Sequence, residues 1–365
     1  MRLDWLDLRD FRCHRVLEFN PGPEVNVLIG NNGSGKTSVL EAIGFLSTLK
    51  SFRRAPEPAL VRQGAEAAVV RGEFGTQGRT LRMEAEVPVE GRKRVLMNGK
   101  RPPSRAAVVG SIALVAFLPD DLDLVKRGPA YRRELVDDTA AALWPQAAVE
   151  QQEYERALRQ RNALLRRDGR HADATSLDVW DDRLARLGAS VIRRRLQAMR
   201  LVGERVERLY GELADAEEAF SWRYQSASVG NGEGALEEVL ASAIAAARPA
   251  DLERRVTTAG PHRDEIAFEL AGRDARARAS QGEQRAVALS LRVAACEVLR
   301  RERGVDPVLI LDDVFSELDA ERSKRLVARL PQGQIFVSTA REDEVPMTGM
   351  RWRVTETGIE ARGAT

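Results

Sequence analysis

The residues most able to do chemistry lie in a glycine-rich segment near the start of the chain. Gly30-Asn31-Asn32-Gly33-Ser34-Gly35-Lys36-Thr37, here called the phosphate loop, fits the G-x-x-x-x-G-K-[ST] pattern that binds nucleotide phosphates. Its glycines allow backbone conformations that turn N–H groups toward an anion, and a following helix adds its dipole. Lys36 is expected to reach the β- and γ-phosphates and Thr37 to ligate Mg²⁺. The loop and Ser38 are therefore predicted to bind ATP and Mg²⁺.

A pair of carboxylates far downstream could complete such a site. The apolar run Val308-Leu309-Ile310-Leu311 is followed by Asp312 and Asp313. A strand of this kind can deliver a magnesium ligand and a group that activates water. We assign the first role to Asp312, directly or through water, and the second to Asp313; an ordinary strand exit is the alternative. Lys36, Asp312 and Asp313 form the predicted catalytic set. The long stretch between Lys36 and Asp312 must therefore fold so that the two ends of the chain meet in space.

A third segment, Ala279-Ser280-Gln281-Gly282-Glu283-Gln284, precedes an almost wholly apolar helical stretch. A serine and a glycine at a helix N-terminus make a second anion site, or they simply cap the helix. The position of the segment, shortly before the carboxylate strand, favours the anion site.

The remaining sequence predicts the elements that position these residues. Apolar residues alternate with charged ones over residues 2–29, which predicts strands leading into the phosphate loop, and a helix is expected from Ser38. Short alternating runs over 67–117, with a hairpin signal at Asn98-Gly99, predict an antiparallel sheet. Further helices are expected at 129–167, 178–213, 236–247 and 284–301, and further strands at 265–270, 308–311 and 334–338. Turns are expected at 169–176 and in the glycine-rich run 230–234.

Bulk composition limits the classes of protein that fit. The 365 residues suffice for two structural units, and 43% hydrophobic with 31% charged residues is typical of a globular protein. A net charge of +2 does not indicate a nucleic-acid partner, although local clusters such as Arg193-Arg194-Arg195 are either solvated faces or parts of a basic surface. Two distant cysteines, Cys13 and Cys296, favour a reducing compartment. Without an apolar run long enough to span a membrane, we expect no membrane partner and a cytoplasmic location.

The order of these motifs resembles an ABC-type ATPase head. Ser280 and Gly282 lie ahead of the carboxylate strand, and Ser316-Glu317-Leu318-Asp319 follows it. In that family, the signature serine and glycine of one subunit close over a γ-phosphate held by the phosphate loop of another. The resemblance implies that Ser280 and Gly282 act in trans, that Asp319 lies at the dimer interface, and that ATP induces a homodimer.

The resemblance to the bacterial RecF family is closer still. Its motifs run in order through the chain: Phe11-Arg12, the phosphate loop, 117–122, Gly260-Pro261-His262-Arg263-Asp264, 280–285 and 311–319. The resemblance implies a cytosolic protein that dimerises with ATP and binds gapped DNA or its double-stranded flank. It also implies work with RecR and RecO to help RecA load in recombinational repair and the SOS response.

The fold that this resemblance implies is α/β, an ATPase head with an antiparallel β subdomain and an inserted α-helical lobe. We place the first part of the head at residues 1–122, the helical lobe at 123–250 and the second part of the head at 251–365.

Several positions depart from the wider ABC pattern or leave a choice open. Asp313 stands where transporters place a glutamate, and Thr339 or Ala340 occupies the region of the switch histidine, so slow hydrolysis is expected. Gln63 is either a glutamine that senses the γ-phosphate and metal or an exposed loop residue. Arg12 either contacts the nucleotide phosphates or lies on the surface at a strand end. His262, between Pro261 and Arg263, is expected to be a structural turn residue rather than a catalytic one.

Two other classes of function were weighed against an ATP-gated DNA clamp. The first is the ATPase subunit of a membrane transporter, which the inserted helical lobe and the missing switch histidine disfavour. The second is a metabolic kinase, which the signature serine disfavours. An ATPase activity that DNA stimulates and that depends on protein concentration would favour the clamp, whereas phosphoryl transfer to a small molecule would favour the kinase.

Overall fold

The computed structural model describes residues 1–76, 78–214, 219–229 and 235–364. The chain divides into two compact units. The sheet unit comprises Met1–Asp123, Arg208–Glu217 and Arg285–Thr365, and the helical unit comprises Leu124–Glu207 and Glu218–Gln284. Two of the divisions fall inside long helices, one in α5 (Ala174–Ala214) and one in α8 (Gln281–Arg303).

A six-stranded sheet forms the centre of the sheet unit, in the order β14-β13-β3-β12-β11-β7. All neighbouring strands are parallel except β14, which pairs antiparallel with β13 at one edge. Parallel strands are buried on both faces, and β11 and β12 are accordingly buried throughout and apolar up to their last one or two residues. The strands are β3 (Val25–Ile29), β7 (Leu114–Phe117), β11 (Val308–Asp312), β12 (Ile335–Thr339), β13 (Met350–Thr355) and β14 (Gly358–Ala364).

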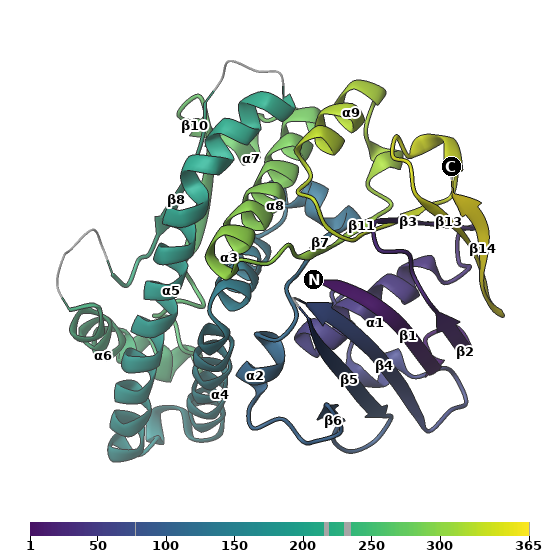
Figure 1. Ribbon diagram of the computed structural model, residues 1–365. Coiled ribbons are helices and arrows are strands. Elements are labelled where there is room, and N and C mark those ends of the chain that lie inside the picture. The colour runs from purple at the N-terminus through teal and green to yellow at the C-terminus, as the bar shows by residue number, and fades with distance from the viewer. Residues whose placement is uncertain (77, 215–218, 230–234, 365) are drawn as a thin grey trace. The chain divides into compact units, whose positions relative to one another are not determined.

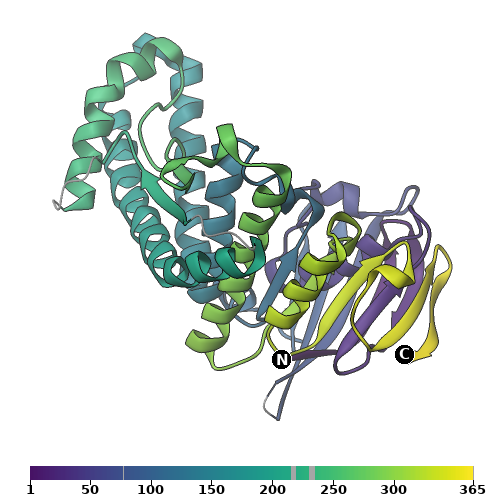
Figure 2. The same cartoon turned by 90° about the horizontal axis from the view of Figure 1, so that it is seen from above.

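A second, antiparallel sheet of the same unit has the order β2-β1-β4-β5-β6. Asn98 and Gly99 both have positive φ angles of 51° and 74°, in the tight turn that the Asn-Gly pair predicted. The strands are β1 (Arg2–Phe11), β2 (His14–Phe19), β4 (Ala67–Thr76), β5 (Arg79–Pro88) and β6 (Arg94–Met97). Figure 2 shows both marked ends of the chain among the strands of the sheet unit.

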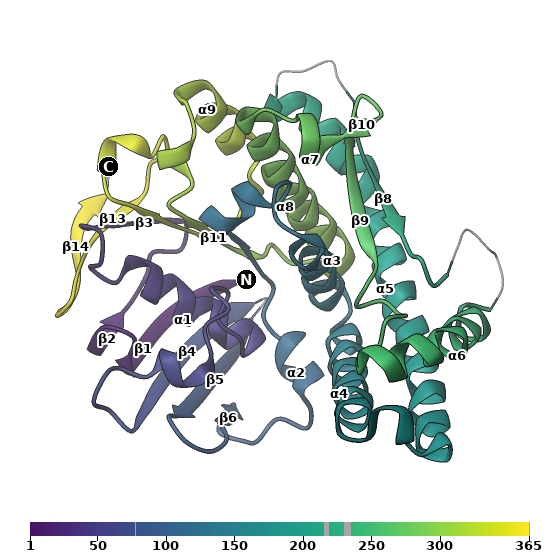
Figure 3. The same cartoon turned by 180° about the vertical axis from the view of Figure 1, so that it is seen from behind.

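Helix α1 (Lys36–Thr48) lies between the two sheets, as Figures 1 and 3 show, and is buried almost all round. On one side, Leu46 approaches Gly72 of β4 so closely that an added Cβ would lie 2.8 Å from its side chain. On the other side, Ile310 of β11 lies 4.0 Å from the Cβ position of Gly44. The helix that follows the phosphate loop is therefore fixed by one continuous apolar core. Shorter helical segments of the unit are Glu57–Leu60, α2 (Arg105–Val109), Pro119–Asp123, Phe315–Glu317, α9 (Ala320–Arg329) and Glu342–Glu344.

The helical unit is built on α4, α5 and α6, whose apolar stripes form a separate core around residues such as Leu184, Ile192, Leu240 and Ile244. A small antiparallel sheet, in the order β10-β9-β8, belongs to the same unit. Its elements are α3 (Pro129–Leu143), α4 (Pro145–Asp168), the short helix Gly169–His171, β8 (Phe220–Gln225), α6 (Leu236–Arg254), β9 (Glu265–Leu270), β10 (Arg273–Asp274) and α7 (Ala275–Arg278).

Several expectations from the sequence need correction. Residues 114–117 form β7, which pairs parallel with β11 and is not part of the antiparallel sheet. The helix predicted at 129–167 is two helices, because Trp144 precedes Pro145 and has extended backbone angles that a helix interior does not allow. The turn predicted at 169–176 is shorter, since α5 begins at Ala174. The glycine-rich turn 230–234 lies outside the described residues.

The first division, after Asp123, lies one residue from the predicted boundary at 122, whereas the helical unit extends beyond the predicted boundary at 250. Residues 251–284 stay with the helical unit, since β9 pairs with β8 and buried Asp251 binds Arg161 of α4. The strands β8, β13 and β14 were not predicted. For β8 a signal exists, because Phe220, Trp222 and Tyr224 place an aromatic ring at every second position.

Candidate functional site

Strand register brings the phosphate loop and the carboxylates to one edge of the six-stranded sheet. β12 lies between β3 and β11, and Ser338 pairs in register with Leu28 on one side and with Asp312 on the other. The carboxyl ends of the three parallel strands therefore meet, which is where α/β sheets bind ligands. The two ends of the chain form one site because strands from both ends alternate in the same sheet.

Asp312 joins the two halves by direct hydrogen bonds. Its Oδ1 accepts from Thr37 Oγ1 at 2.9 Å and from Ser338 Oγ at 2.6 Å. The side chain is 4% exposed, and burial raises the pKa of Asp312 while the two hydrogen bonds oppose that change. Thr37 and Asp312, predicted from separate motifs, are thus in contact.

Lys36 lies folded over its own loop. Its Nζ donates to the carbonyl oxygens of Gly30 at 2.7 Å and Asn31 at 3.0 Å, and the side chain is buried. Burial lowers the pKa of Lys36, and the charges of Asp313 and Asp312 oppose this effect. These partners are neutral carbonyl groups, so an anion with a stronger attraction can replace them.

The loop also offers unsatisfied donors. Gly33 and Gly35 have φ angles of 85° and 98°, which only glycine adopts without strain, and no side chain caps the N-terminus of α1. Ser34 Oγ is buried and has no hydrogen-bond partner. Free N–H groups at a helix start and an orphaned hydroxyl fit a phosphate.

The donor set also fits Mg²⁺, because Thr37 and Asp312 offer a hydroxyl and a carboxylate oxygen, the hard ligands that this ion prefers. Among the described residues, no group of three or more His, Cys, Asp or Glu side chains could hold a metal ion. A magnesium ion that takes its other ligands from phosphates and water does not require such a group.

Asp313 is held by its backbone rather than by its carboxylate. Its N–H donates to Ser338 Oγ at 3.0 Å, Ser316 Oγ donates to its carbonyl oxygen at 2.8 Å, and its φ angle is 53°. Burial raises the pKa of Asp313, with Ser316 and Lys36 acting against that change. The carboxylate of Asp313 is therefore more basic than an ordinary aspartate, a property that suits a group that polarises water.

Arg12 is bound to helix α1 and does not lie free on the surface at a strand end. Its guanidinium forms two hydrogen bonds of 2.7 Å to the fully buried carboxylate of Glu41 in α1, and a third bond to the carbonyl oxygen of Ala59. These contacts tie Arg12 to α1 directly behind the phosphate loop, and a guanidinium whose donors are partly occupied is less free to bind phosphate.

Gln63, the other position that the sequence left open, is exposed.

The signature segment lies at the N-terminus of α8. Ser280 and Glu283 form a capping box, in which Ser280 N–H donates to Glu283 Oε2 at 2.6 Å and Glu283 N–H donates to Ser280 Oγ at 3.3 Å. Gly282 lies in the first turn, and Ser280 is exposed. Asp319 similarly caps α9 through the N–H of Arg322. Within this single chain, Ser280 and Asp319 are helix caps on the surface.

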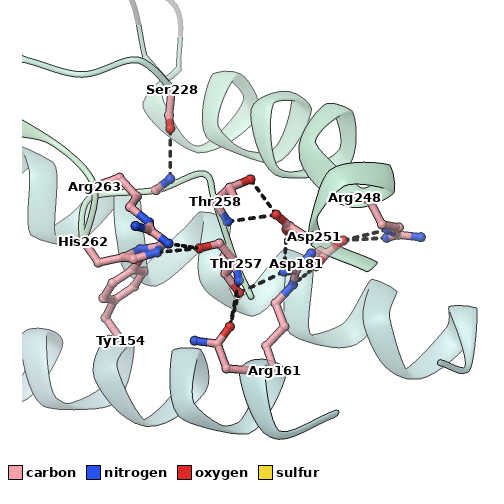
Figure 4. A network of polar contacts seen from close by, with 12 residues as sticks. Tyr154, Arg161, Asp181, Ser228, Arg248, Asp251, Thr257, Thr258, His262 and Arg263 are labelled. Carbon is pink, nitrogen blue, oxygen red and sulfur yellow. Dashed lines mark hydrogen bonds and ion pairs between the residues drawn. The ribbon is translucent and has the colours of Figure 1, made fainter. Parts of the chain in front are cut away.

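His262 belongs to a buried polar cluster of the helical unit, which Figure 4 shows. Its Nε2 donates to Thr257 O at 3.1 Å, so its neutral Nδ1 accepts from the hydroxyl of Tyr154 at 2.7 Å. Burial lowers the pKa of His262 to about 4. A neutral, fully bonded imidazole supports the structural role expected of it.

Sequence reasoning missed residues that support the site. Ser338 binds Asp312, Glu41 holds Arg12, and Arg53 lowers the pKa of Asp312 by its charge. No motif marks any of them. The hydroxyl directly after the apolar run of β12, next to the carboxylate strand, was the one signal available for Ser338.

Comparison with known proteins was decisive for the family. Residues 2–359 match the profile of the RecF/RecN/SMC N-terminal domain. The chain is 40% identical to the DNA replication and repair protein RecF of Acidothermus cellulolyticus, over 98% of this chain and 99% of that protein. The chain belongs to the RecF family. The RecF protein of Streptomyces avermitilis is 38% identical over 99% of this chain and 100% of that protein.

Solved structures agree with this membership. The recombination mediator RecF with bound ATP, described as acting in the RecFOR pathway, superposes with a TM-score of 0.90 at 28% identity, covering 99% of this chain and 97% of that one. An SMC head bound to the C-terminal winged-helix domain of ScpA has a TM-score of 0.56 at 16% identity, covering 100% and 98%, and shares the fold. The predicted α/β ATPase-head fold is confirmed.

Family membership also separates the chain from the two rival classes, the transporter subunit and the metabolic kinase. Within the described part of the chain, every helix is too short or too polar to cross a membrane.

Proposed function

We propose that this RecF-family protein is an ATP-dependent DNA-binding protein of recombinational repair, and that an ATP-induced homodimer clamps DNA at gaps and single-strand–double-strand junctions. The observation that carries the proposal is the hydrogen bond between Thr37 Oγ1 and Asp312 Oδ1, at 2.9 Å. It joins the two halves of a nucleotide site from opposite ends of the chain. The ATP-bound relative RecF supports the same nucleotide here.

When bound, ATP with Mg²⁺ would supply the phosphoryl group and the charge that draws these residues together. Lys36 would exchange its loop carbonyls for the β- and γ-phosphates, while Ser34 Oγ and the free N–H groups of α1 bind phosphate oxygens. Thr37 and Asp312 would hold the metal, with Gln63 as a further metal ligand only if its loop moves inward. Asp313 would orient and polarise the attacking water.

Slow hydrolysis is part of the proposal. An aspartate is one methylene shorter than a glutamate, so Asp313 holds a water less closely. Thr339 or Ala340 occupies the region of the switch histidine; Thr339 Oγ1 lies 2.8 Å from Arg341 O and 3.0 Å from Glu344 Oε2, which compete for its one hydrogen. A hydroxyl engaged in this way does not supply the mobile charge of a histidine. Weak ATPase activity, stimulated by DNA, would reset the clamp.

Dimer closure would use the exposed caps. Ser280 and Gly282 of one subunit would cover the γ-phosphate on the phosphate loop of another, with Asp319 at the interface. The N-terminus of α8 is suited to an anion through its helix dipole. A ligand that binds only the closed dimer stabilises it by mass action, without fast catalysis.

The pathway assignment rests on the names of the relatives. They are described as DNA replication and repair proteins and as a recombination mediator of the RecFOR pathway. We accordingly propose RecR as a partner, with RecO and RecA in the same pathway, and RecA loading and SOS induction as the outcome. A cytoplasmic location follows from those partners.

The test is light scattering of the purified protein with and without ATP, beside a direct assay of ATP binding. We expect ATP to dimerise wild type, Asp313→Asn to hold the dimer longer, and Ser280→Arg to bind ATP yet stay monomeric. Lys36→Arg should weaken ATP binding. The matched control is Ser242→Arg, which places the same bulk on an exposed serine of α6. If wild type hydrolyses ATP but every protein stays monomeric, the clamp is wrong.

DNA binding has its own readout. Affinity for gapped DNA should rise with ATP and fall steeply with added salt, because phosphate contacts release counterions. An affinity that ignores both ATP and salt would contradict a clamp that works through the DNA backbone.

A further inference from the structure

Cys13 and His14 form an unexplained pair beside the phosphate loop. Arg12 and Cys13 make the two-residue turn between β1 and β2, where Phe11 pairs with His14. Cys13 is exposed, whereas His14 is fully buried. An accessible thiol and a buried imidazole therefore share the tip of one hairpin.

This hairpin tip packs directly on the phosphate loop. A Cβ added to Gly35 would lie 2.3 Å from His14 Nε2 and 2.7 Å from Cys13 Sγ, so not even a methyl group fits between them. Cys13 Sγ is also 3.9 Å from the hydroxyl of Ser38, in the first turn of α1. A group attached to this sulfur is therefore joined to an atom that already contacts the phosphate loop and the first turn of α1.

The state of His14 suits a reactive thiol. Its Nε2 donates to the carbonyl oxygen of Gly35 at 3.2 Å, which leaves Nδ1 as the basic nitrogen of the neutral ring. That Nδ1 is buried and has no hydrogen-bond partner. Partial burial acts to raise the pKa of Cys13, but the interactions with His14 and Ser38 and a backbone hydrogen bond together lower it. The pKa of His14 is correspondingly raised against its own burial.

We propose that Cys13 is a thiol-modification site, at which a mixed disulfide with a low-molecular-weight thiol blocks the phosphate loop and so prevents ATP binding. The inference rests on the proposed ATP-binding function of that loop. The occupant is a disulfide of a small thiol, because Cys13 is exposed to small molecules and its sulfur lies beside Gly35 and Ser38, at the start of α1.

The reaction is thiol–disulfide exchange. The Cys13 thiolate attacks one sulfur of the disulfide, a new S–S bond forms, and the old S–S bond breaks. The second sulfur leaves with the electron pair as a thiolate and takes up the proton that Cys13 lost. Cys13 is oxidised, the leaving thiol is reduced, and a reducing thiol reverses the step.

The other cysteine is the matched control. Cys296 is fully buried in α8, and burial raises the pKa of its thiol. The experiment uses the full-length protein with oxidised glutathione as the disulfide and mass spectrometry as the readout. Wild type and Cys296→Ala should take up one glutathione at Cys13, whereas Cys13→Ser should take up none until it is denatured. A Cys13 that reacts more slowly than free N-acetylcysteine overturns the proposal.

The second arm measures binding of a fluorescent ATP analogue. Glutathionylated Cys296→Ala should bind it at least about tenfold more weakly than the reduced protein, with recovery after dithiothreitol. Cys13→Ser should bind normally with or without the oxidant, and ATP should slow the modification of wild type. Unchanged ATP binding by the modified protein refutes the block. If the reduced protein binds no ATP, the proposed function itself has failed, and the rate at Cys13 still reports on the thiol.

Discussion

Two regions of the molecule bury a cation, and they do so in opposite ways. In the phosphate loop, Lys36 is bonded to two neutral carbonyl oxygens. In the helical unit, Arg161 of α4 is bonded to Asp181 at 2.6 Å, Asp251 at 2.7 Å and Thr257 at 2.9 Å. We call Arg161 and these three partners the Arg161 network (Figure 4).

The difference separates a proposed ligand site from a network in which carboxylates already compensate the buried charge, although Arg161 Nη2 is buried there without a hydrogen-bond partner. Burial lowers the pKa of Lys36, and its two hydrogen-bond partners are neutral carbonyl groups that a phosphate could replace. The Arg161 network supplies two carboxylates, and Asp251 in turn accepts from the N–H and hydroxyl of Thr258. Only the first arrangement leaves electrostatic attraction to spare for a ligand.

The largest effect is expected from breaking the Arg161 network. Arg161→Met leaves Asp251 buried without a cation and Asp181 with Arg248 alone, which should lower the free energy of unfolding by about 3–5 kcal/mol. Chemical denaturation measures this loss. The control is Arg248→Met, whose partly exposed guanidinium also binds Asp181, and a cost of about 1 kcal/mol or less is expected there. Equal losses in the two variants would mean that burial does not set the strength of the network.

For Lys36 in the phosphate loop we expect the opposite result, a loss of ATP binding with little loss of stability. Lys36→Ala should weaken ATP binding at least about tenfold, because a hydrogen bond to a charged group contributes roughly 1.5–3 kcal/mol. Its unfolding free energy should change by less than about 1 kcal/mol, since only carbonyl contacts are lost. Isothermal titration and denaturation measure the two quantities, with the exposed Lys50→Ala as control. A large stability loss with unchanged ATP affinity would make Lys36 a structural residue.

The same contrast explains what the sequence could predict. The phosphate loop and Asp312 were found because phosphate chemistry requires fixed residue types at short spacing, and strands with buried faces are recognisable from their apolar runs. Their contact through Thr37 was implied by the motifs alone. Much of the sheet unit was predictable for this reason. The exceptions are β13 and β14, which were not predicted, and β7, whose four residues do not distinguish a parallel from an antiparallel partner.

The Arg161 network was not predictable. Its members lie far apart in sequence, at positions 161, 181, 251 and 257, and each is an ordinary residue type in its own segment. Only the packing of α4, α5 and α6 brings them together. The predicted boundary at 250 separated Asp251 from its partners for the same reason, because a domain boundary depends on long-range contacts that local composition does not record.

The dependence of stability on pH tests the burial of His262 in the polar cluster of the helical unit. The pKa of His262 is about 4 in the folded protein, below its ordinary value of 6.5. As pH falls through 6.5 the unfolded chain takes up the proton first, so this stability is complete above pH 6.5 and is lost as pH falls toward 4. Between pH 7.5 and 5.5 the loss should be about 1–1.5 kcal/mol.

The measurement is the difference in unfolding free energy between wild type and His262→Gln across that range. The comparison with the variant is needed because His14, whose pKa is raised, contributes with the opposite sign. The exposed His171→Gln is the control and should keep the slope of wild type. A wild-type slope that persists in His262→Gln would assign the pH dependence to another group.

The smallest expected effect tests whether Ser280 binds a ligand, as proposed for Lys36, or is a structural residue like those of the Arg161 network. Ser280→Ala removes the cap of α8, and Ser104→Ala removes the comparable cap of α2, where Ser104 Oγ accepts from Ala107 N–H. Each should cost about 1 kcal/mol of stability. If Ser280 also awaits a ligand, as Lys36 does, only Ser280→Ala should weaken ATP-induced dimerisation in light scattering. If both variants dimerise as wild type does, Ser280 is satisfied by Glu283 alone, and the signature segment is a structural element like the Arg161 network.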